Sequence, residues 1–220
     1  MNTDLRVYAL VDPQHCFGRA PAELTRLLVQ GGTTLLQLRD KTGSTRTMIE
    51  ETRAMRGELG QSGVPLLIND RVDVALAAEA DGVHVGWDDM PVADARLLLG
   101  RTAIIGLSIK TAAQAQAAPL ELLDYVCIGG VFETSSKDNP EPPIGVAGLA
   151  QLAAIIRKRK PGMLVGAIAG IDERNAADVI AAGADGVAVI SALSRASDPA
   201  QATKSLRAIV DRALAQRSAA

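Results

Sequence analysis

The sequence predicts an α/β fold of the (β/α)8 barrel class, with residues 1–220 forming one barrel domain. Short apolar runs alternate with longer segments of helical period from end to end. The chain length of 220 residues lies within the roughly 200 to 250 residues of a compact barrel. The tetrapeptide Ala-Asp-Gly-Val at 80–83 recurs at 184–187. That separation equals about four βα units, half of an eight-unit ring.

Eight runs have the strand pattern, being short, apolar and bounded by turn residues. We predict strands at residues 7–11, 34–39, 65–69, 82–85, 103–108, 125–129, 163–167 and 186–190. Between them, apolar residues recur at helical spacing. The first helix has Leu24, Leu27 and Leu28 on one face, and the last has Leu206, Ile209, Val210, Ala213 and Leu214. Pro21, Pro91 and Pro199 fall at predicted first turns, where a missing N–H costs nothing.

The composition indicates how the core is built and which partners are excluded. Hydrophobic residues make up 48% of the chain, but only five are aromatic, so Val, Ile, Leu and Ala must fill the core. That filling is typical of parallel strands covered by helices. The 23 basic and 25 acidic residues give a net charge of −2 without a basic run, which argues against a nucleic-acid partner.

The chain contains no uncharged apolar stretch of about 18 residues, so we expect a soluble, cytoplasmic protein without a membrane partner. Cys16 and Cys127 are far apart and have no metal-ligand spacing, which predicts reduced thiols with structural roles. The sequence leaves the oligomeric state open, a homo-oligomer included.

Cationic side chains follow the second predicted strand. Period-two alternation turns Gln37, Arg39 and Lys41 to one side and Leu38 to the other. Arg offers a planar fork for phosphate oxygens and Lys a mobile point charge. The motif therefore predicts an anion site at the barrel mouth, with a solvated strand end as the alternative.

Carboxylates follow the third and fourth predicted strands, with Asn69 and Asp70 after the third and Asp88 and Asp89 after the fourth. Neighbouring barrel strands would bring Asp70 and Asp89 close together. Two carboxylates without a Cys or His cluster favour a hard divalent ion, and Mg2+ takes one or two carboxylates together with water and substrate phosphates. The alternative is that each Asp caps a helix.

Further polar residues end the fourth, fifth and sixth predicted strands. His84 alternates with two valines, a pattern most typical of a satisfied core histidine. Ser108 ends the fifth strand. The polar segment 130–145 contains Thr134, Ser136 and Lys137, a composition suited to a lid over phosphate, with an Ω-loop as the alternative.

Loops after the seventh and eighth strands form the usual phosphate site of such barrels. Ala169 and Gly170 follow the seventh strand, and Ile190 and Ser191 open the turn after the eighth. Free backbone N–H groups at these turns would bind an anion. No Ser-His-Asp or Cys-His arrangement is evident in the sequence, which argues against covalent catalysis.

Taken together, these motifs resemble the thiamine-phosphate synthase family over nearly the whole chain. The matching segments are Gln37-Leu38-Arg39-Asp40-Lys41, Asn69-Asp70-Arg71-Val72-Asp73, Gly82-Val83-His84-Val85-Gly86, Asp89-Met90-Pro91, Gly106-Leu107-Ser108, Thr134-Ser135-Ser136-Lys137, and Gly183-Ala184-Asp185-Gly186 followed by Ser191-Ala192. The resemblance implies a transferase that joins a pyrimidine pyrophosphate to a thiazole phosphate and releases pyrophosphate.

The resemblance also implies residue roles. Residues that hold the pyrimidine pyrophosphate would be Gln37, Arg39, Lys41, Asn69 and Lys137, with Ser108 near the pyrimidine. Residues that hold the thiazole phosphate would be Thr134, Ser136, Gly170, Ile190 and Ser191, and the substrate-binding set also includes His84 and Ala169. Asp70 and Asp89 would ligate Mg2+. The catalytic set is Arg39, Lys41, Ser108 and Lys137, because Mg2+ and cations would stabilise the departing pyrophosphate.

Two positions depart from the family pattern: Trp87 stands where Gln is usual, and Ala169 where Gly is usual. Residues 137–143 also form a less typical lid. One rival interpretation is a thiazole tautomerase of the same superfamily, and another is a non-catalytic barrel that binds a phosphorylated ligand. The presence of Arg39, Asp70 and Asp89 among the pyrophosphate and metal residues favours the synthase.

Overall fold

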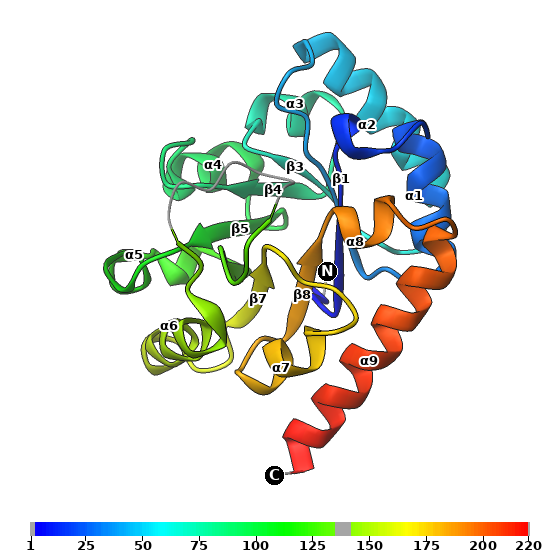
Figure 1. The fold of residues 1–220 in the computed structure, drawn as a ribbon. Coiled ribbons are helices and arrows are strands. Elements are labelled where there is room, and N and C mark those ends of the chain that lie inside the picture. The colour runs from blue at the N-terminus through cyan, green and yellow to red at the C-terminus, as the bar shows by residue number, and fades with distance from the viewer. Residues whose placement is uncertain (1–2, 135–141, 220) are drawn as a thin grey trace.

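Eight parallel strands form a closed barrel in sequential order, surrounded by helices (Figure 1). The structure is a computed structural model that describes residues 3–134 and 142–219. Its strands are β1 (Val7–Val11), β2 (Leu35–Leu38), β3 (Leu66–Asn69), β4 (Gly82–Val85), β5 (Ile104–Ile109), β6 (Tyr125–Ile128), β7 (Leu164–Ile168) and β8 (Gly186–Val189). The ring closes where β8 pairs with β1. The predicted fold class is confirmed, and each predicted strand is correct to within one residue at either end.

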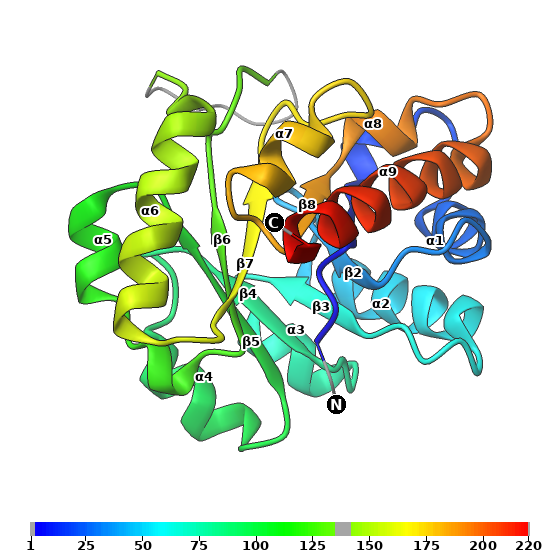
Figure 2. The ribbon, with the colours of Figure 1, turned by 90° about the horizontal axis from the view of Figure 1, so that it is seen from below.

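Helices cover the outside of the barrel. Figure 2 shows this arrangement with the molecule turned so that it is seen from below the view of Figure 1. The α-helices in the described residues are α1 (Pro21–Gln30), α2 (Thr45–Leu59), α3 (Val72–Ala77), α4 (Val92–Leu99), α5 (Ala112–Ala117), α6 (Gly145–Arg159), α7 (Ala176–Ala181), α8 (Ser191–Ser194) and α9 (Pro199–Ala219). Short 3-10 helices span Pro13–His15 and Leu120–Leu122. No helix in the described ranges is long and apolar enough to cross a membrane.

Side chains along each strand alternate between the barrel interior and the helices, as period-two geometry requires. On β1, for example, Val7 and Val11 pack in the layer between strands and helices, whereas Tyr8 and Leu10 belong to a separate interior cluster. Tyr125 of β6 lies in the same interior cluster, and its ring meets the Tyr8 ring edge-on at 5.8 Å between centroids. The interior therefore combines apolar side chains with the two phenolic hydroxyls, which are hydrogen-bonded to the buried side chains of Gln37 and His84.

The repeated tetrapeptide starts two strands on opposite sides of the ring, β4 and β8. The carboxylate of Asp81 accepts a hydrogen bond from the Leu66 N–H at 2.8 Å, and that of Asp185 accepts one from the Val165 N–H at 2.9 Å. The following glycine packs against backbone, since a Cβ would lie 1.9 Å from a carbonyl oxygen at position 82 and 1.7 Å at position 186. The repeat is thus a device for starting a strand close beside its neighbours.

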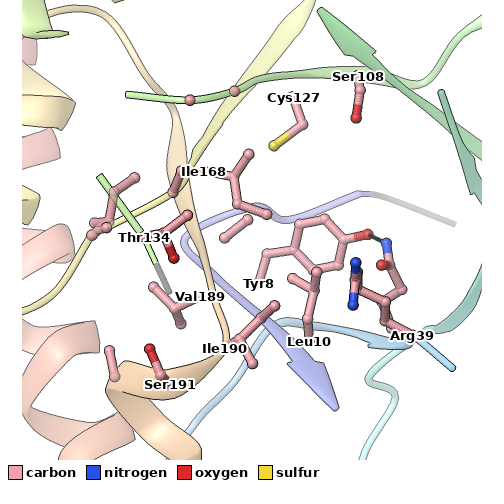
Figure 3. A pocket seen from close by; sticks show the side chains of 18 of the residues that line it. Tyr8, Leu10, Arg39, Ser108, Cys127, Thr134, Ile168, Val189, Ile190 and Ser191 are labelled. Carbon is pink, nitrogen blue, oxygen red and sulfur yellow. Dashed lines mark hydrogen bonds between the residues drawn. The ribbon is translucent and has the colours of Figure 1, made fainter. Parts of the chain in front are cut away.

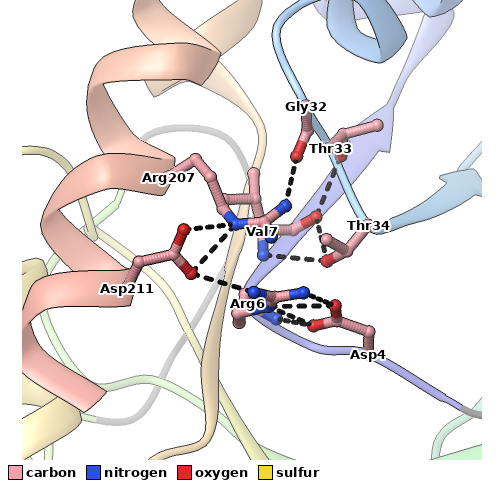
Figure 4. Close-up of polar contacts among 8 residues, drawn as sticks. All are labelled: Asp4, Arg6, Val7, Gly32, Thr33, Thr34, Arg207 and Asp211. Atoms are coloured by element: carbon pink, nitrogen blue, oxygen red, sulfur yellow. Dashed lines mark hydrogen bonds and ion pairs between the residues drawn. The ribbon is translucent and has the colours of Figure 1, made fainter. Parts of the chain in front are cut away.

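Ion pairs and hydrogen bonds fasten α9 to the start of β1, at the end of the barrel remote from the strands' carboxyl ends (Figure 4). Arg207 of α9 donates to the Gly32 carbonyl at 2.9 Å and to Asp211 at 2.9 Å. Asp211 in turn pairs with Arg6 at 3.2 Å, and Arg6 also pairs with Asp4. In such barrels this end serves stability, which leaves the opposite end for chemistry.

Candidate active site

A cavity of about 320 Å³ opens at the carboxyl ends of the strands (Figure 3). Apolar side chains from β1, β7 and β8 form one part of its wall, including Leu10, Ile168 and Val189. Polar side chains from β2 to β5 form another part. The loops after β6, β7 and β8 complete the wall. The cavity therefore lies on the face where barrels of this class carry their active sites.

Ten of the predicted site residues line this cavity. They are Gln37, Arg39, Asn69, His84, Ser108, Thr134, Ala169, Gly170, Ile190 and Ser191. Lys41, Asp70 and Asp89 are not in the lining and form a cluster of their own. Ser136 and Lys137 lie outside the described residues, as does most of the proposed lid. The two predicted cations of segment 37–41 therefore lie at different places. Arg39 lines the cavity, and Lys41 contacts the carboxylate of Asp70.

A buried carboxylate anchors Arg39. Asp12 follows β1, is 3% exposed, and accepts from Arg39 Nη1 at 2.5 Å. The Asp12 side chain also accepts from the Gln14 N–H at 3.0 Å, which fixes its own orientation. A charge-assisted contact of this kind restrains the guanidinium fork. The sequence analysis missed Asp12, although its place directly after a strand at the same barrel end as Arg39 was an available signal.

Three polar side chains surround the carboxylate of Asp70. Asn69 Nδ2 donates to it at 2.6 Å, Lys41 forms a short ion pair with it, and Asp89 lies in hydrogen-bonding contact. Burial raises the pKa of Asp70 above its ordinary value, the Lys41 hydrogen bond opposes that rise, and the Asp89 carboxylate adds to it. Asp70 adopts a left-handed backbone conformation, with φ 62°, which Asp tolerates better than most residues.

The pair of carboxylates fits a hard divalent cation. Asp70 and Asp89 meet as expected for neighbouring strand ends, and two like charges in contact are costly unless a cation or proton lies with them. Asp89 is held by the Gly86 N–H at 2.8 Å. Among residues 3–134 and 142–219 no group of three or more His, Cys, Asp or Glu side chains gathers as a metal site, so substrate oxygens and water would complete the shell.

The alternative role of these carboxylates as helix caps is wrong. The N-cap residues of α3 and α4, both within the described residues, are Arg71 and Pro91, and neither helix has a side-chain cap hydrogen bond. Trp87, which directly precedes Asp88 and Asp89 in the sequence, is 40% exposed and is not in the cavity lining.

A chain of hydrogen bonds crosses the barrel interior beneath the cavity. Gln37 contacts the Tyr8 hydroxyl in a short hydrogen bond, and the Tyr125 hydroxyl donates to Tyr8 at 2.9 Å. His84 Nδ1 lies 2.9 Å from Tyr125 Oη, and His84 Nε2 lies 2.9 Å from Ser108 Oγ. Burial raises the pKa of both tyrosines well above 10, so both phenols stay protonated. The sequence analysis assigned no role to either tyrosine.

The loop after β7 needs left-handed backbone at two successive positions. Gly170 has φ 64°, and a Cβ there would lie 2.3 Å from the Glu133 carbonyl oxygen. Ala169 has φ 91°, a conformation that favours glycine. The glycine usual in the family at position 169 therefore has a backbone reason, and this chain carries strain there. Phe132 N–H donates to the Ala169 carbonyl at 3.1 Å, which ties this loop to the one after β6.

The remaining predicted residues lie across the cavity from the polar strand ends. Ile190 precedes α8 and Ser191 begins it, and both residues line the cavity together with Thr134. Figure 3 shows Thr134, Ile190 and Ser191 around the same opening, away from Arg39. The cavity therefore has two polar regions, one with side-chain cations and carboxylates nearby and one with hydroxyls and loop backbone.

Comparison with known sequences decides the family. A family described as thiamine monophosphate synthase matches residues 7–193. The chain belongs to this family. A thiamine-phosphate synthase of Agrobacterium fabrum is 54% identical over 97% of both chains, and one of Chloroflexus aurantiacus is 44% identical over 94% of this chain and 93% of its own. The resemblance stated from the motifs is confirmed.

A solved structure shares the fold of this thiamine monophosphate synthase family member. The thiamine phosphate pyrophosphorylase from Pyrococcus furiosus superposes with a TM-score of 0.83 at 34% identity. The match covers 97% of this chain and 98% of that one. The match therefore extends over nearly the whole length of both chains.

Proposed function

We propose that this chain is a thiamine-phosphate synthase, a transferase of thiamine biosynthesis. It condenses 4-amino-2-methyl-5-hydroxymethylpyrimidine pyrophosphate with 4-methyl-5-hydroxyethylthiazole phosphate and releases pyrophosphate. The observation that carries the proposal is the pairing of two polar regions around one cavity of about 320 Å³. Such a volume suits small-molecule substrates, and the names of the relatives point to the same reaction.

The pyrophosphate binds at the region of Arg39, with Asn69 beside it and Lys41 close to the carboxylates. Lys137, which lies outside the described residues, is assigned to the same group on the resemblance alone. Asp70 and Asp89 would hold Mg2+, which when bound neutralises charge on the pyrophosphate. Arg39 contributes a fork held in place by Asp12, so it can meet the phosphate oxygens without first being ordered.

The thiazole phosphate binds at the other region. Thr134 and Ser136 supply hydroxyls, and the backbone at Gly170, Ile190 and Ser191 supplies N–H groups. The left-handed conformation of Gly170 supports this assignment, because successive N–H groups at such turns can point to one side and form an anion site. The two anionic groups would then flank the apolar part of the cavity, where the two rings meet.

In the reaction the bond from the pyrimidine methylene carbon to the pyrophosphate oxygen breaks, and a bond from that carbon to the thiazole nitrogen forms. The substitution is dissociative, so positive charge develops on the pyrimidine. Ser108 and Gln37 orient that ring, and the apolar wall of Leu10, Ile168 and Val189 keeps water from the cation. Arg39 and Lys41 stabilise the leaving pyrophosphate. Cys16 and Cys127, two buried cysteines far apart in the sequence, support a cytoplasmic location.

The test is pyrophosphate release by purified protein supplied with both substrates, with and without Mg2+. We expect release that requires both substrates and stops when EDTA removes the metal. Omitting the thiazole phosphate is the matched control. Thiazole phosphate binding without pyrophosphate release would instead favour the tautomerase or the non-catalytic binder, because neither needs the pyrophosphate and metal residues.

A further inference from the structure

The side chain of Arg19, in the segment between β1 and α1, binds the backbone at the end of α8. Its Nη1 atom donates to the Ser194 carbonyl at 3.2 Å, and its Nη2 atom donates to the carbonyls of Ala196 at 3.2 Å and Ser197 at 3.3 Å. Ser194 is the last residue of α8, so these acceptors lie where a helix leaves its carbonyl groups without intrahelical donors. Arg19 therefore closes the end of a helix that lies 175 residues further along the chain.

A second contact joins the same two segments. The guanidinium carbon of Arg195 lies 4.9 Å from the centroid of the Phe17 ring, within the range of a cation–π interaction. Phe17 has a left-handed backbone with φ 51°, which is rare for a bulky residue, and Gly18 follows with φ 84°. In this conformation Phe17 and Arg19 both contact the end of α8. Backbone strain of this kind persists where surrounding contacts maintain it, and the contact with Arg195 is one of them.

The helix that Arg19 binds is a single turn that carries part of the cavity wall. α8 has four residues, too few to be stable without tertiary contacts. Ile190, directly before it, and Ser191 and Ala192, at its start, line the cavity. The Ser194 hydroxyl donates to the Ile190 carbonyl at 3.1 Å, which links the end that Arg19 binds to the residue before the turn. Loss of the Arg19 contacts is therefore expected to loosen the cavity wall at Ile190 and Ser191.

The segment that carries Arg19 begins with the residue that anchors Arg39. Asp12 follows β1, and its carboxylate accepts from Arg39 Nη1. Cys16 links the two ends of the segment, since its thiol donates to the Asp12 carbonyl at 3.2 Å and its carbonyl accepts from the Arg19 N–H at 3.2 Å. None of these three residues is in the cavity lining. Residues 12–19 thus support both polar regions of the cavity from behind.

We propose that Arg19 is a positioning residue for the phosphate of the thiazole substrate. It acts through α8 and touches neither substrate, just as Asp12 acts through Arg39 on the pyrophosphate side. The inference rests on the proposed function for the assignment of Ile190 and Ser191 to the thiazole phosphate. The Arg19 N–H that meets Cys16 belongs to the backbone, so a side-chain substitution leaves that link to Asp12 in place.

The effect on α8 can be measured without a ligand. The N–H groups of Ser194 and Arg195 donate to carbonyls one turn earlier, both at 3.1 Å. We expect Arg19→Gln to speed hydrogen exchange of these two amides by about tenfold relative to amides of β3. The matched control is Arg207→Gln, because Arg207 also donates across 175 residues, to the Gly32 carbonyl, but at the opposite end of the barrel. Exchange in Arg19→Gln that equals exchange in the control overturns the proposal.

The effect on binding is measured by calorimetry with thiazole phosphate, with the unphosphorylated thiazole alcohol and with the pyrimidine pyrophosphate. Arg19→Gln should bind thiazole phosphate about tenfold more weakly, with affinity for the other two ligands nearly unchanged. Arg19→Lys, which keeps a charged donor, should recover part of the loss, and it serves as the test variant if Arg19→Gln does not fold.

The outcomes separate the inference from the proposed function. If the wild type binds thiazole phosphate but the Arg19 variants lose no affinity for it, or lose affinity equally for all three ligands, the positioning role is overturned and the proposed function stands. A wild type that binds no thiazole phosphate contradicts both the proposed function and a role for Arg19 toward that phosphate. The exchange rates then still decide whether Arg19 holds α8 in place.

Discussion

Arg39 is held from behind by Asp12, whose buried carboxylate accepts from Arg39 Nη1 at 2.5 Å. Asp12→Asn removes the charge while keeping the shape, so the guanidinium should lose its fixed orientation. We expect KM for the pyrimidine pyrophosphate to rise by about tenfold, with KM for the thiazole phosphate nearly unchanged. Steady-state kinetics with each substrate varied in turn measures both values.

The matched control for Asp12 is Asp4→Asn. Asp4 also pairs with an arginine, Arg6, but at the far end of the barrel. This control should leave both KM values unchanged. An Asp12→Asn enzyme that matches the Asp4→Asn enzyme would show that Arg39 needs no anchor.

Ala169→Gly should stabilise the protein. Ala169 has φ 91°, and glycine at that position relieves the steric cost of a left-handed backbone. We expect the free energy of unfolding to rise by about 1 kcal/mol, measured by urea denaturation. Ala167→Gly is the control, because Ala167 is buried in β7 and should lose stability by about 1 kcal/mol when its methyl group is removed. A loss of stability in Ala169→Gly would contradict the strain argument.

Gly170→Ala should disturb the thiazole-phosphate region. The added Cβ would lie 2.3 Å from the Glu133 carbonyl oxygen and force the loops after β6 and β7 apart. We expect KM for the thiazole phosphate to rise and the free energy of unfolding to fall by about 1–3 kcal/mol. Gly63→Ala controls for backbone strain alone, because Gly63 has φ 73° and open space around it. If both variants behave alike, contact with Glu133 is not what matters.

Asp89→Asn should sharply reduce turnover at limiting Mg2+ and leave thiazole-phosphate binding nearly intact. The amide oxygen can still accept from the Gly86 N–H, so the turn is kept while one metal-binding charge is lost. Asp88→Asn, at the exposed neighbouring position, is the control. Turnover is measured by pyrophosphate release over a range of Mg2+ concentrations. Normal turnover in Asp89→Asn at limiting Mg2+ would remove Asp89 from the metal site.

Local patterns were enough to predict the barrel and much of the cavity. Strand boundaries follow from short apolar runs bounded by turn residues. Alternation predicted that Gln37, Arg39 and Lys41 lie on one side, and of these Gln37 and Arg39 line the cavity. The proximity of Asp70 and Asp89 followed from the order of neighbouring strands. These predictions depend on contacts between elements that are neighbours in the sequence, so the spacing of residue types along the chain is enough to make them. The assigned roles of the site residues stay predictions.

Long-range contacts were beyond such reasoning. Tyr8 and Tyr125 are 117 residues apart, and only closure of the ring brings their hydroxyls together. Neither Asp12 nor the backbone strain at Ala169 was foreseen. In each case the partner or the conformation depends on how distant strand ends converge, which residue types and periodicity do not specify.

Pairing of β8 with β1 also protects the protein from aggregation through exposed strand edges. In the complete ring every strand has a neighbour on both sides, so no row of backbone N–H and C=O groups is left to recruit another molecule. A chain that ends before residue 186 would lack β8 and leave β1 and β7 with bare edges. Such a product of early termination or proteolysis would tend to aggregate by intermolecular strand pairing, and its self-association would begin at those two strands.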